Sequence, residues 1–171
     1  MEWTCSGRSA CGMGALEGKR MVPTIVTGGS GFLGRKLLEE LESTTVLSRT
    51  AAHTAKLPQH VGTEFWKPLD EVDPALFEGV GAVIHLAGAG IADSRWTKVR
   101  KQQLWDSRVS VTRNLVTALS KVAVRPKALV SASAVGFYGN RGEAELTEQL
   151  GAGDGFLPAA LSEITGKGIT A

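Results

Sequence analysis

Four glycines stand within seven residues in the stretch IVTGGSGFLGRKL, residues 25–37. Gly28, Gly31 and Gly34 form the pattern G-x-x-G-x-x-G, and Gly29 with the last two also fits G-x-G-x-x-G. Glycine permits a tight turn and lets backbone amides approach an anion without side chains in the way. A helix that begins directly after the loop points its unpaired N–H groups and positive dipole end at the same anion. This spacing predicts a site for the pyrophosphate of a dinucleotide.

A second chemical signal follows about 20 residues later, where an acidic residue would hold the ribose hydroxyls of NAD. The segment VLSRT has Ser48 and Arg49 there instead. A guanidinium can pair with a 2′-phosphate, which a carboxylate would repel. The sequence therefore favours NADP over NAD, the alternative being that Arg49 is an ordinary surface residue of a loop.

Short apolar runs alternate with amphipathic stretches from residue 22 onward, which is typical of a parallel sheet with crossover helices. Strands are expected at 24–27, 44–48, 82–86 and 128–132, with a weaker one around 64–66, and helices at 31–41, 74–77 and 97–122. The runs AVIHLAG and KALVSAS are expected to be covered on both faces. The fold class is α/β, a partial Rossmann fold with parallel sheet order 3-2-1-4-5 and helices on both faces.

Composition excludes several classes of partner. The 171 residues correspond to about one domain, and 43% hydrophobic content with a net charge of +2 indicates neither nucleic acid nor an anionic membrane as partner. No apolar window is long enough to span a bilayer. The basic residues between Arg95 and Arg113 are interpreted as a solvated helix face, because they alternate with other residues at helical spacing.

The two ends of the chain lack this pattern. Residues 1–20 are expected to be a disordered extension, with a transit peptide as the alternative, and residues 21–157 to form the dinucleotide-binding domain. Cys5 and Cys11 have no nearby His or second cysteine pair, so no metal site is predicted. A reducing, cytoplasmic location is expected, or an organelle if the extension is a transit peptide.

The segments TGGSGFLG, VIHLAG and SASAVGFYG, in this order and spacing, resemble the extended short-chain dehydrogenase/reductases, the NAD-dependent epimerase/dehydratase family. The likeness covers residues 21 to about 157. Within it, RWTKVRKQQLWDSRVSVTRNLVTAL and GDGFL are similar to a subfamily of uncharacterised epimerase-like proteins, some labelled cell division inhibitor. The resemblance implies that the cofactor lies against one loop and the end of the fourth strand, at Gly28, Ser30, Gly31, Phe32, Leu33 and Gly34 for the pyrophosphate and at Ala87 and Gly88 for the adenosine half.

Catalysis in this family rests on a Ser after the fifth strand and on a Tyr-x-x-x-Lys pair. Ser133 fits the Ser position if Gly136 is an insertion, Ser131 is the alternative, and capping of the strand end is equally open for both. The pair is absent, because Gly142 stands four residues after Tyr138, the only tyrosine. Tyr138 is therefore a candidate to line the substrate pocket and is not carried over as the base. His85 is interpreted as a hydrogen-bonded core residue.

The end of the chain also departs from the family, whose members continue for a further hundred or more residues with the last strands and a substrate-binding lobe. The tail 158–171 is expected to lack a sustained apolar face, and the sheet to expose an edge through which chains could associate. The resemblance implies an NADP-binding epimerase or oxidoreductase with an unknown small-molecule substrate, weakly active or inactive in this shortened form. The alternatives are a non-catalytic NADP-binding regulatory module and a fragment with no function of its own.

Overall fold

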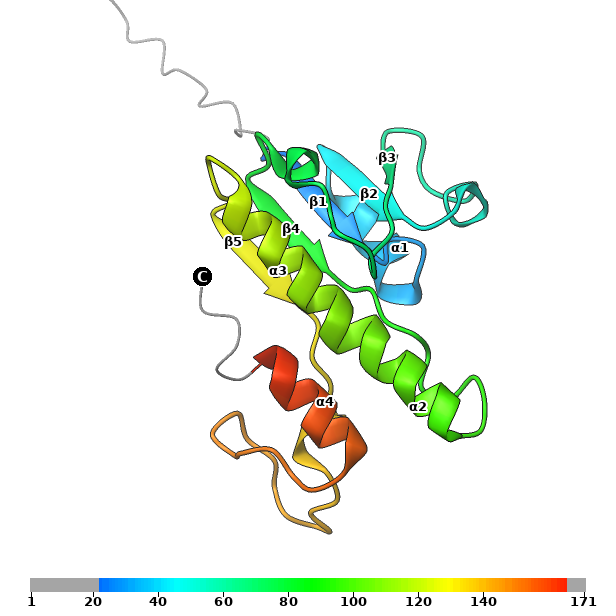
Figure 1. Ribbon diagram of the computed structural model, residues 1–171, viewed down its shortest axis with the longest axis vertical. Helices are drawn as coiled ribbons and strands as arrows, with labels where there is room; N and C mark the ends of the chain where they lie inside the picture. The colour runs from blue at the N-terminus through cyan, green and yellow to red at the C-terminus, as the bar shows by residue number, and fades with distance from the viewer. Residues whose placement is uncertain (1–21, 166–171) are drawn as a thin grey trace, which may run out of the picture.

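The computed structural model describes residues 22–165. Its five strands form one parallel sheet in the order β3-β2-β1-β4-β5, as Figure 1 shows. They are β1 (Thr24–Thr27), β2 (Thr44–Ser48), β3 (Gly62–Phe65), β4 (Ala82–His85) and β5 (Ala128–Ser131). The order and the parallel pairing confirm the expected Rossmann topology, and the order reverses between β1 and β4.

The helices of residues 22–165 are α1 (Phe32–Glu40), α2 (Lys98–Trp105), α3 (Val111–Lys121) and α4 (Phe156–Thr165), with short 3₁₀ helices at Ala51–His53, Pro74–Phe77 and Val135–Tyr138. Of these, α1 and α3 cover the two faces of the sheet. Because strand side chains alternate between faces, Val26 packs with Leu38 of α1 on one face. Ile25 packs on the other face with Leu115 of α3. Both faces of the central strands are therefore buried, as parallel sheets require.

The helix expected over 97–122 is helical nearly throughout but contains an irregular turn. A π-helical segment, Asp106–Ser110, separates α2 from α3. Figure 1 shows the whole as one rod, in which α3 lies over the sheet and α2 extends beyond it. The Thr112 hydroxyl donates to the Arg108 carbonyl oxygen at 2.5 Å, and the Ser107 hydroxyl donates to the Leu104 carbonyl oxygen at 3.1 Å. Side-chain hydroxyls that bond backbone carbonyls in this way perturb the helical ladder. The expectation of an uninterrupted helix is wrong at this turn.

The segment after residue 157 also differs from expectation. Helix α4 crosses the expected boundary at 157/158, and its residues Ala160, Leu161 and Ile164 are buried together with Val109 of the π-helical turn. The Phe156 ring, at the start of α4, contacts the rings of two tryptophans in and before α2, Trp96 and Trp105. The expected absence of an apolar face is therefore wrong for 158–165. Residues 166–171 and the expected extension at 1–20 lie outside the described residues.

Strand β5 is open on one face. Leu129 packs against the core beneath α3, whereas Val130 points to the other face and is 56% exposed. Among residues 22–165, β5 pairs with β4 alone. The expectation that both faces of β5 are covered is wrong, because α1 packs over β1 and β2 and leaves the neighbouring surface of β5 open.

Candidate nucleotide-binding site

The glycine loop joins the carboxyl end of β1 to α1. Gly28 has φ of +74°, and a Cβ atom built on it would lie 2.7 Å from the carbonyl carbon of Leu86. A Cβ atom on Gly34 would lie 2.5 Å from the Gly28 carbonyl oxygen and 2.6 Å from the Gly29 Cα atom. The Gly31 N–H donates to that same Gly28 oxygen at 3.0 Å, which closes the turn. The backbone of strand, turn and helix is therefore packed too tightly for side chains at Gly28 and Gly34.

The amino terminus of α1 opens toward the outside of this loop. Gly31 is the N-cap residue and supplies no side-chain cap, and the first turn holds no acidic residue. Phe32 and Leu33, the first two residues of the helix, are 78% and 65% exposed, and Ser30 is exposed as well. The first-turn N–H groups and the positive end of the helix dipole therefore face open space. This arrangement fits a pyrophosphate, whose oxygens would accept from those N–H groups.

The two residues at the end of β2 that are predicted to select the cofactor differ in burial and in hydrogen bonding. Ser48 is buried, and its hydroxyl donates to the Thr50 carbonyl oxygen at 3.0 Å. Arg49 is exposed, and its guanidinium forms no hydrogen bond or ion pair with any of residues 22–165. Ser48 is thus engaged in its own turn, while the Arg49 cation is available to a ligand.

The segment after β4 lies directly against the glycine loop. A Cβ atom on Gly28 would lie 2.8 Å from the Ala87 nitrogen. The Ala87 N–H donates to the Thr27 hydroxyl oxygen at 3.3 Å, while Gly88 is exposed. The structure thus brings Ala87 and Gly88 to the carboxyl ends of β1 and β4, the switch point at which open α/β sheets bind ligands.

His85 links three elements inside the protein. Its Nδ1 atom accepts from the Thr27 hydroxyl at 2.6 Å, and its Nε2–H donates to the Thr112 oxygen at 3.1 Å. These roles follow because the Thr112 proton is committed to the Arg108 carbonyl oxygen. Burial lowers the pKa of His85 to about 4, so the ring is neutral near pH 7. This geometry agrees with the interpretation of His85 as a hydrogen-bonded core residue.

The buried ring makes folding sensitive to acid. Below pH 6.5 the unfolded chain takes up a proton that folded His85, with its pKa near 4, does not, so stability falls as the pH drops from 6.5 toward 4. The shift corresponds to about 3 kcal/mol of unfolding free energy. Denaturant unfolding between pH 6.5 and 4 is expected to show this slope of unfolding free energy against pH in the wild type. The same slope is expected in His53→Gln, where the replaced ring is exposed. His85→Gln should remove most of this slope; equal slopes in all three proteins would refute the assignment.

The two catalytic candidates lie on the segment that follows β5. Ser133 is exposed there, and Tyr138 ends the 3₁₀ helix Val135–Tyr138 with its ring edge-on to Phe137, at 5.2 Å between centroids. The alternative serine, Ser131, has a buried hydroxyl without a hydrogen-bond partner among the described residues. No hydrogen bond joins Ser133 to Tyr138 within that part of the chain. The structure therefore gathers these residues on one segment but does not form a catalytic pair from them.

Comparison with known proteins places this geometry in a family. The model of the NAD dependent epimerase/dehydratase family matches residues 24–155, which include the glycine loop, all five strands and the segment after β5. The chain belongs to the NAD-dependent epimerase/dehydratase family. Its glycine loop, sheet order and open carboxyl edge are thus those of an epimerase-family Rossmann domain.

The epimerase-family relatives are longer than this chain. Epimerase family protein Mb2239 of Mycobacterium bovis is 36% identical over 138 residues, which cover 77% of this chain and 43% of that protein. Among solved structures, the nucleoside-diphosphate sugar epimerase from Corynebacterium glutamicum has a TM-score of 0.65 at 29% identity, covering 83% of this chain and 29% of that one. The human epimerase family protein SDR39U1 (isoform 2), solved with NADPH, has a TM-score of 0.63 at 24% identity, covering 83% and 47%. This chain therefore spans less than half the length of these relatives.

Two arginines of this epimerase-family domain are partly buried, although their spacing predicts that they face solvent. The Arg100 side chain is only 16% exposed and pairs with Asp93 at 3.3 Å, and Arg108 is half-buried against Gly88, with its guanidinium carbon 3.4 Å from a Cβ built on that glycine. The interpretation of the basic run as a solvated helix face is wrong at these two positions. Helical spacing alone does not predict the burial of these two arginines, because the surface on which they pack lies in the loop after β4.

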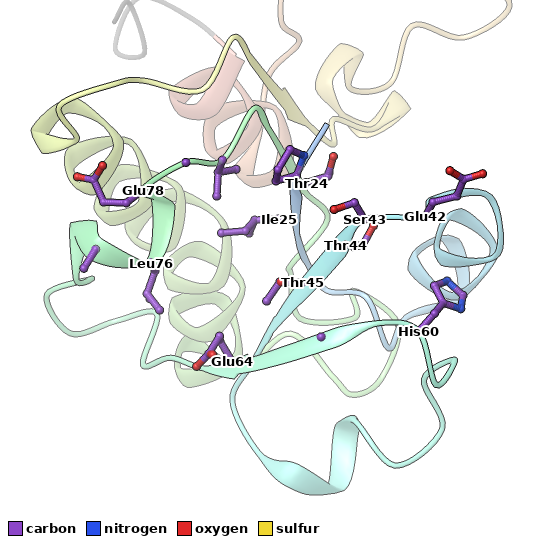
Figure 2. A pocket seen from close by; sticks show the side chains of 15 residues that line it. Thr24, Ile25, Glu42, Ser43, Thr44, Thr45, His60, Glu64, Leu76 and Glu78 are labelled. Carbon is purple, nitrogen blue, oxygen red and sulfur yellow. The ribbon is translucent and has the colours of Figure 1, made fainter. Parts of the chain in front are cut away.

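A separate hollow of about 570 Å³ opens at the amino end of the sheet, near the starts of β1 and β2. Figure 2 shows Thr24, Thr45, Glu64 and Leu76 around it. Since epimerase-family sheets are of the open parallel kind, ligands are expected at the opposite, carboxyl edge. The hollow therefore lies at the edge of the sheet where this fold does not usually bind its ligand.

The described part of this epimerase-family chain offers no membrane span and no metal site. None of the helices in residues 22–165 has the length and apolar character needed to cross a bilayer. The same residues contain no group of three or more His, Cys, Asp or Glu side chains that could hold a metal ion.

Proposed function

We propose that this chain binds a nicotinamide dinucleotide with its pyrophosphate on the amino terminus of α1. The observation that carries the proposal is the glycine loop, whose Gly28 and Gly34 have no room for a Cβ atom while Gly31 is exposed beside an uncapped helix. Backbone N–H groups of Phe32 and Leu33 bind the phosphate oxygens in this arrangement, without a lysine. The bound nicotinamide supplies hydride transfer.

NADP is proposed as the preferred cofactor. Arg49 is exposed at the carboxyl end of β2 and has no protein partner among residues 22–165, so its guanidinium can turn to a 2′-phosphate. Ser48 contributes by shaping the turn with its bond to Thr50. Ala87 and Gly88 lie beside the glycine loop, where the adenosine half of the cofactor would pass.

Arg49→Ala tests the preference directly. The affinity for NADPH is expected to fall by about 1.5–3 kcal/mol, because one charge-assisted hydrogen-bonding group is removed, while the affinity for NADH stays nearly unchanged. Isothermal titration with both cofactors measures this difference. Arg125→Ala, at another exposed arginine, serves as the control. Equal losses of affinity for NADPH and NADH would contradict the assignment. Added salt should reduce the preference for NADPH over NADH if the ion pair between Arg49 and the 2′-phosphate is exposed to solvent.

The reaction class proposed for the family member is epimerisation or oxidoreduction of a nucleotide-sugar or a small alcohol. Ser133 is the candidate to orient the reacting oxygen, and Tyr138 the candidate to line the substrate pocket. The 171 residues contain no Tyr-x-x-x-Lys pair. Since proton transfer by such groups contributes roughly 10²- to 10⁴-fold in rate, we propose that these residues on their own turn over little substrate.

A non-catalytic, cofactor-binding module is the second candidate function. The missing Tyr-x-x-x-Lys pair favours it, because the glycine loop can still bind pyrophosphate without any proton donor. NADPH consumption over a panel of carbonyl substrates, set beside NADPH binding by the same preparation, separates the two. Binding without turnover supports the module, and rapid turnover rules it out.

A further inference from the structure

The hollow at the amino end of the sheet lies beside a short connection between β3 and β4. This connection contains only the 3₁₀ helix Pro74–Phe77, where a parallel sheet usually has a full crossover helix. Ile25 of β1, Leu76 and Val80 line the hollow, and they belong to the buried core or pack against it. The hollow of about 570 Å³ therefore has an apolar floor and is large enough for a small organic molecule.

Three glutamates stand around this floor. Figure 2 shows Glu42, Glu64 and Glu78 at separate points of the rim. All three are exposed, and none forms a hydrogen bond or an ion pair with any of residues 22–165. Among the described residues that line the hollow there is no Lys or Arg, and His60 uses its Nε2 atom on two carbonyl oxygens at the carboxyl end of α1, each at 3.2 Å. The hollow therefore carries a negative charge that is spread around its rim.

A hydroxyl group at the hollow lacks a hydrogen-bond partner. Thr44, at the start of β2, lines the hollow and is only 6% exposed, and its Oγ1 atom has no partner among the described residues. A buried polar group without a partner costs free energy. Since a hydroxyl oxygen accepts hydrogen bonds, a ligand that donates an N–H group from the hollow would remove this cost.

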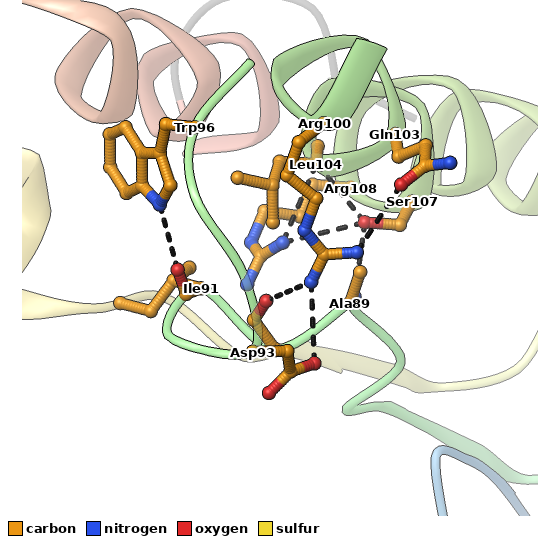
Figure 3. Close-up of polar contacts among 10 residues, drawn as sticks. Ala89, Ile91, Asp93, Trp96, Arg100, Gln103, Leu104, Ser107 and Arg108 are labelled. Atoms are coloured by element: carbon orange, nitrogen blue, oxygen red, sulfur yellow. Dashed lines mark hydrogen bonds and ion pairs between the residues drawn. The ribbon is translucent and has the colours of Figure 1, made fainter.

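The opposite, carboxyl edge of the sheet differs in charge. Figure 3 shows Arg100 and Arg108 reaching from the helical rod toward the segment that follows β4, with Asp93 beside Arg100. These two guanidinium groups repel an organic cation, whereas the glutamates of the hollow attract one. A cationic ligand is therefore directed to the amino edge, and its site is independent of the proposed nucleotide site.

We propose that the hollow binds an aliphatic polyamine, a ligand in which methylene chains join several ammonium groups. The ammonium groups pair with separate glutamates of the rim, such as Glu64 and Glu78, which flank Leu76 in Figure 2. The methylene groups pack on the apolar floor, and one N–H group donates to the Thr44 hydroxyl oxygen. A metal ion fits less well, because it is compact and gathers its ligands around a single point.

Calorimetric titration of the full 171-residue chain with spermidine tests the proposal, with hexaamminecobalt(III) as the matched probe. Both cations carry three positive charges near neutral pH, but only spermidine has methylene groups. Saturable binding of spermidine is expected, with hexaamminecobalt(III) at least about 10-fold weaker because it buries no apolar surface. Equal affinity for the two cations, or no saturable binding of spermidine, overturns the proposal.

Substitutions at the rim and in the floor locate the site. Glu64→Gln/Glu78→Gln is expected to weaken spermidine binding about 5- to 30-fold, since each exposed ion pair contributes up to about 5-fold in affinity. Glu143→Gln/Glu148→Gln removes two exposed glutamates of the segment after β5 and should bind spermidine as the wild type does. Ala75→Trp keeps every carboxylate but fills the hollow from an exposed position of the 3₁₀ helix, so it should abolish binding.

These variants act through different causes, since the double Gln variant removes charge and Ala75→Trp removes space. Thermal unfolding of each variant shows first that it folds. Loss of spermidine binding in both supports the hollow as the site. The proposal is overturned if Glu64→Gln/Glu78→Gln binds spermidine as tightly as Glu143→Gln/Glu148→Gln, or if folded Ala75→Trp binds it as the wild type does. If Ala75→Trp does not fold, the two double variants decide alone.

Discussion

Gly34→Ala is expected to lower the free energy of unfolding by about 3 kcal/mol, at the upper end of the usual cost of overpacking. The added Cβ atom would lie 2.5 Å from the Gly28 oxygen and 2.6 Å from the Gly29 Cα atom. All of the atoms in contact belong to backbone, so no side chain can rotate away and α1 must move from the loop. For a chain of this size, the loss corresponds to a fall of roughly 10 °C in the midpoint of thermal unfolding, measured by circular dichroism.

Two other glycines provide the controls for Gly34→Ala. A Cβ atom on Gly151 meets nothing within 4 Å, so Gly151→Ala should leave the midpoint unchanged. Gly79 also has open space but a φ of +72°, so Gly79→Ala isolates the cost of a left-handed backbone conformation. If Gly34→Ala unfolds at the same temperature as Gly151→Ala, the tight contact in the glycine loop is refuted.

Gly31→Val is expected to reduce dinucleotide affinity by at least about 100-fold while leaving the fold intact. Gly31 has φ of −72°, which any residue can adopt, and its Cβ position lies 3.2 Å from one backbone atom only, the Gly28 oxygen. That oxygen must shift by a few tenths of an ångström to admit a side chain. The pyrophosphate cannot admit one, since the phosphate must approach the loop closely. Titration with NADPH and with NADH should show the same loss, because the two cofactors share this group.

Gly151→Val is the matched control for Gly31→Val, with the same substitution at an exposed glycine far from the loop in sequence. It should bind both cofactors as the wild type does. Gly31→Val that unfolds normally and binds NADPH with unaltered affinity would remove the argument that the pyrophosphate rests on this loop.

The parts of the fold that the sequence predicts best are those with local causes. Strands β1 and β2 have the predicted bounds, because each is a short apolar or β-branched run between clear breakers. The start of α1 at Phe32 follows from the glycines before it. The helix over 97–122 is predicted by its apolar periodicity, and the apolar side chains of this helical rod include Leu104 and Leu115, which are 1% and 0% exposed.

The parts that escaped prediction depend on contacts between distant segments. Helix α4 is a single short helix whose apolar side faces Val109, about 50 residues earlier in the chain, so its sequence alone does not reveal a buried face. At the π-helical turn the Thr112 hydroxyl donates to the Arg108 carbonyl oxygen and accepts from His85, a residue of β4. Local propensity contains neither interaction.

The residues of the candidate site also include some that the sequence predicts and some that it does not. The glycine loop and Arg49 were predictable because spacing after a strand specifies both. Arg100 and Arg108 were not, since arginines at helical spacing most often face solvent and only the loop after β4 buries these two. The roles of Ser133 and Tyr138 remain predictions, because they depend on where a substrate is held.

Titration of the 171-residue chain with NADPH and with NADH, followed by calorimetry, tests the central claim most directly. We expect saturable binding at one site per chain, tighter for NADPH, and its loss in Gly31→Val with the unfolding midpoint preserved. A folded wild-type chain that shows no saturable binding of either cofactor would contradict the assignment of the glycine loop as a dinucleotide site.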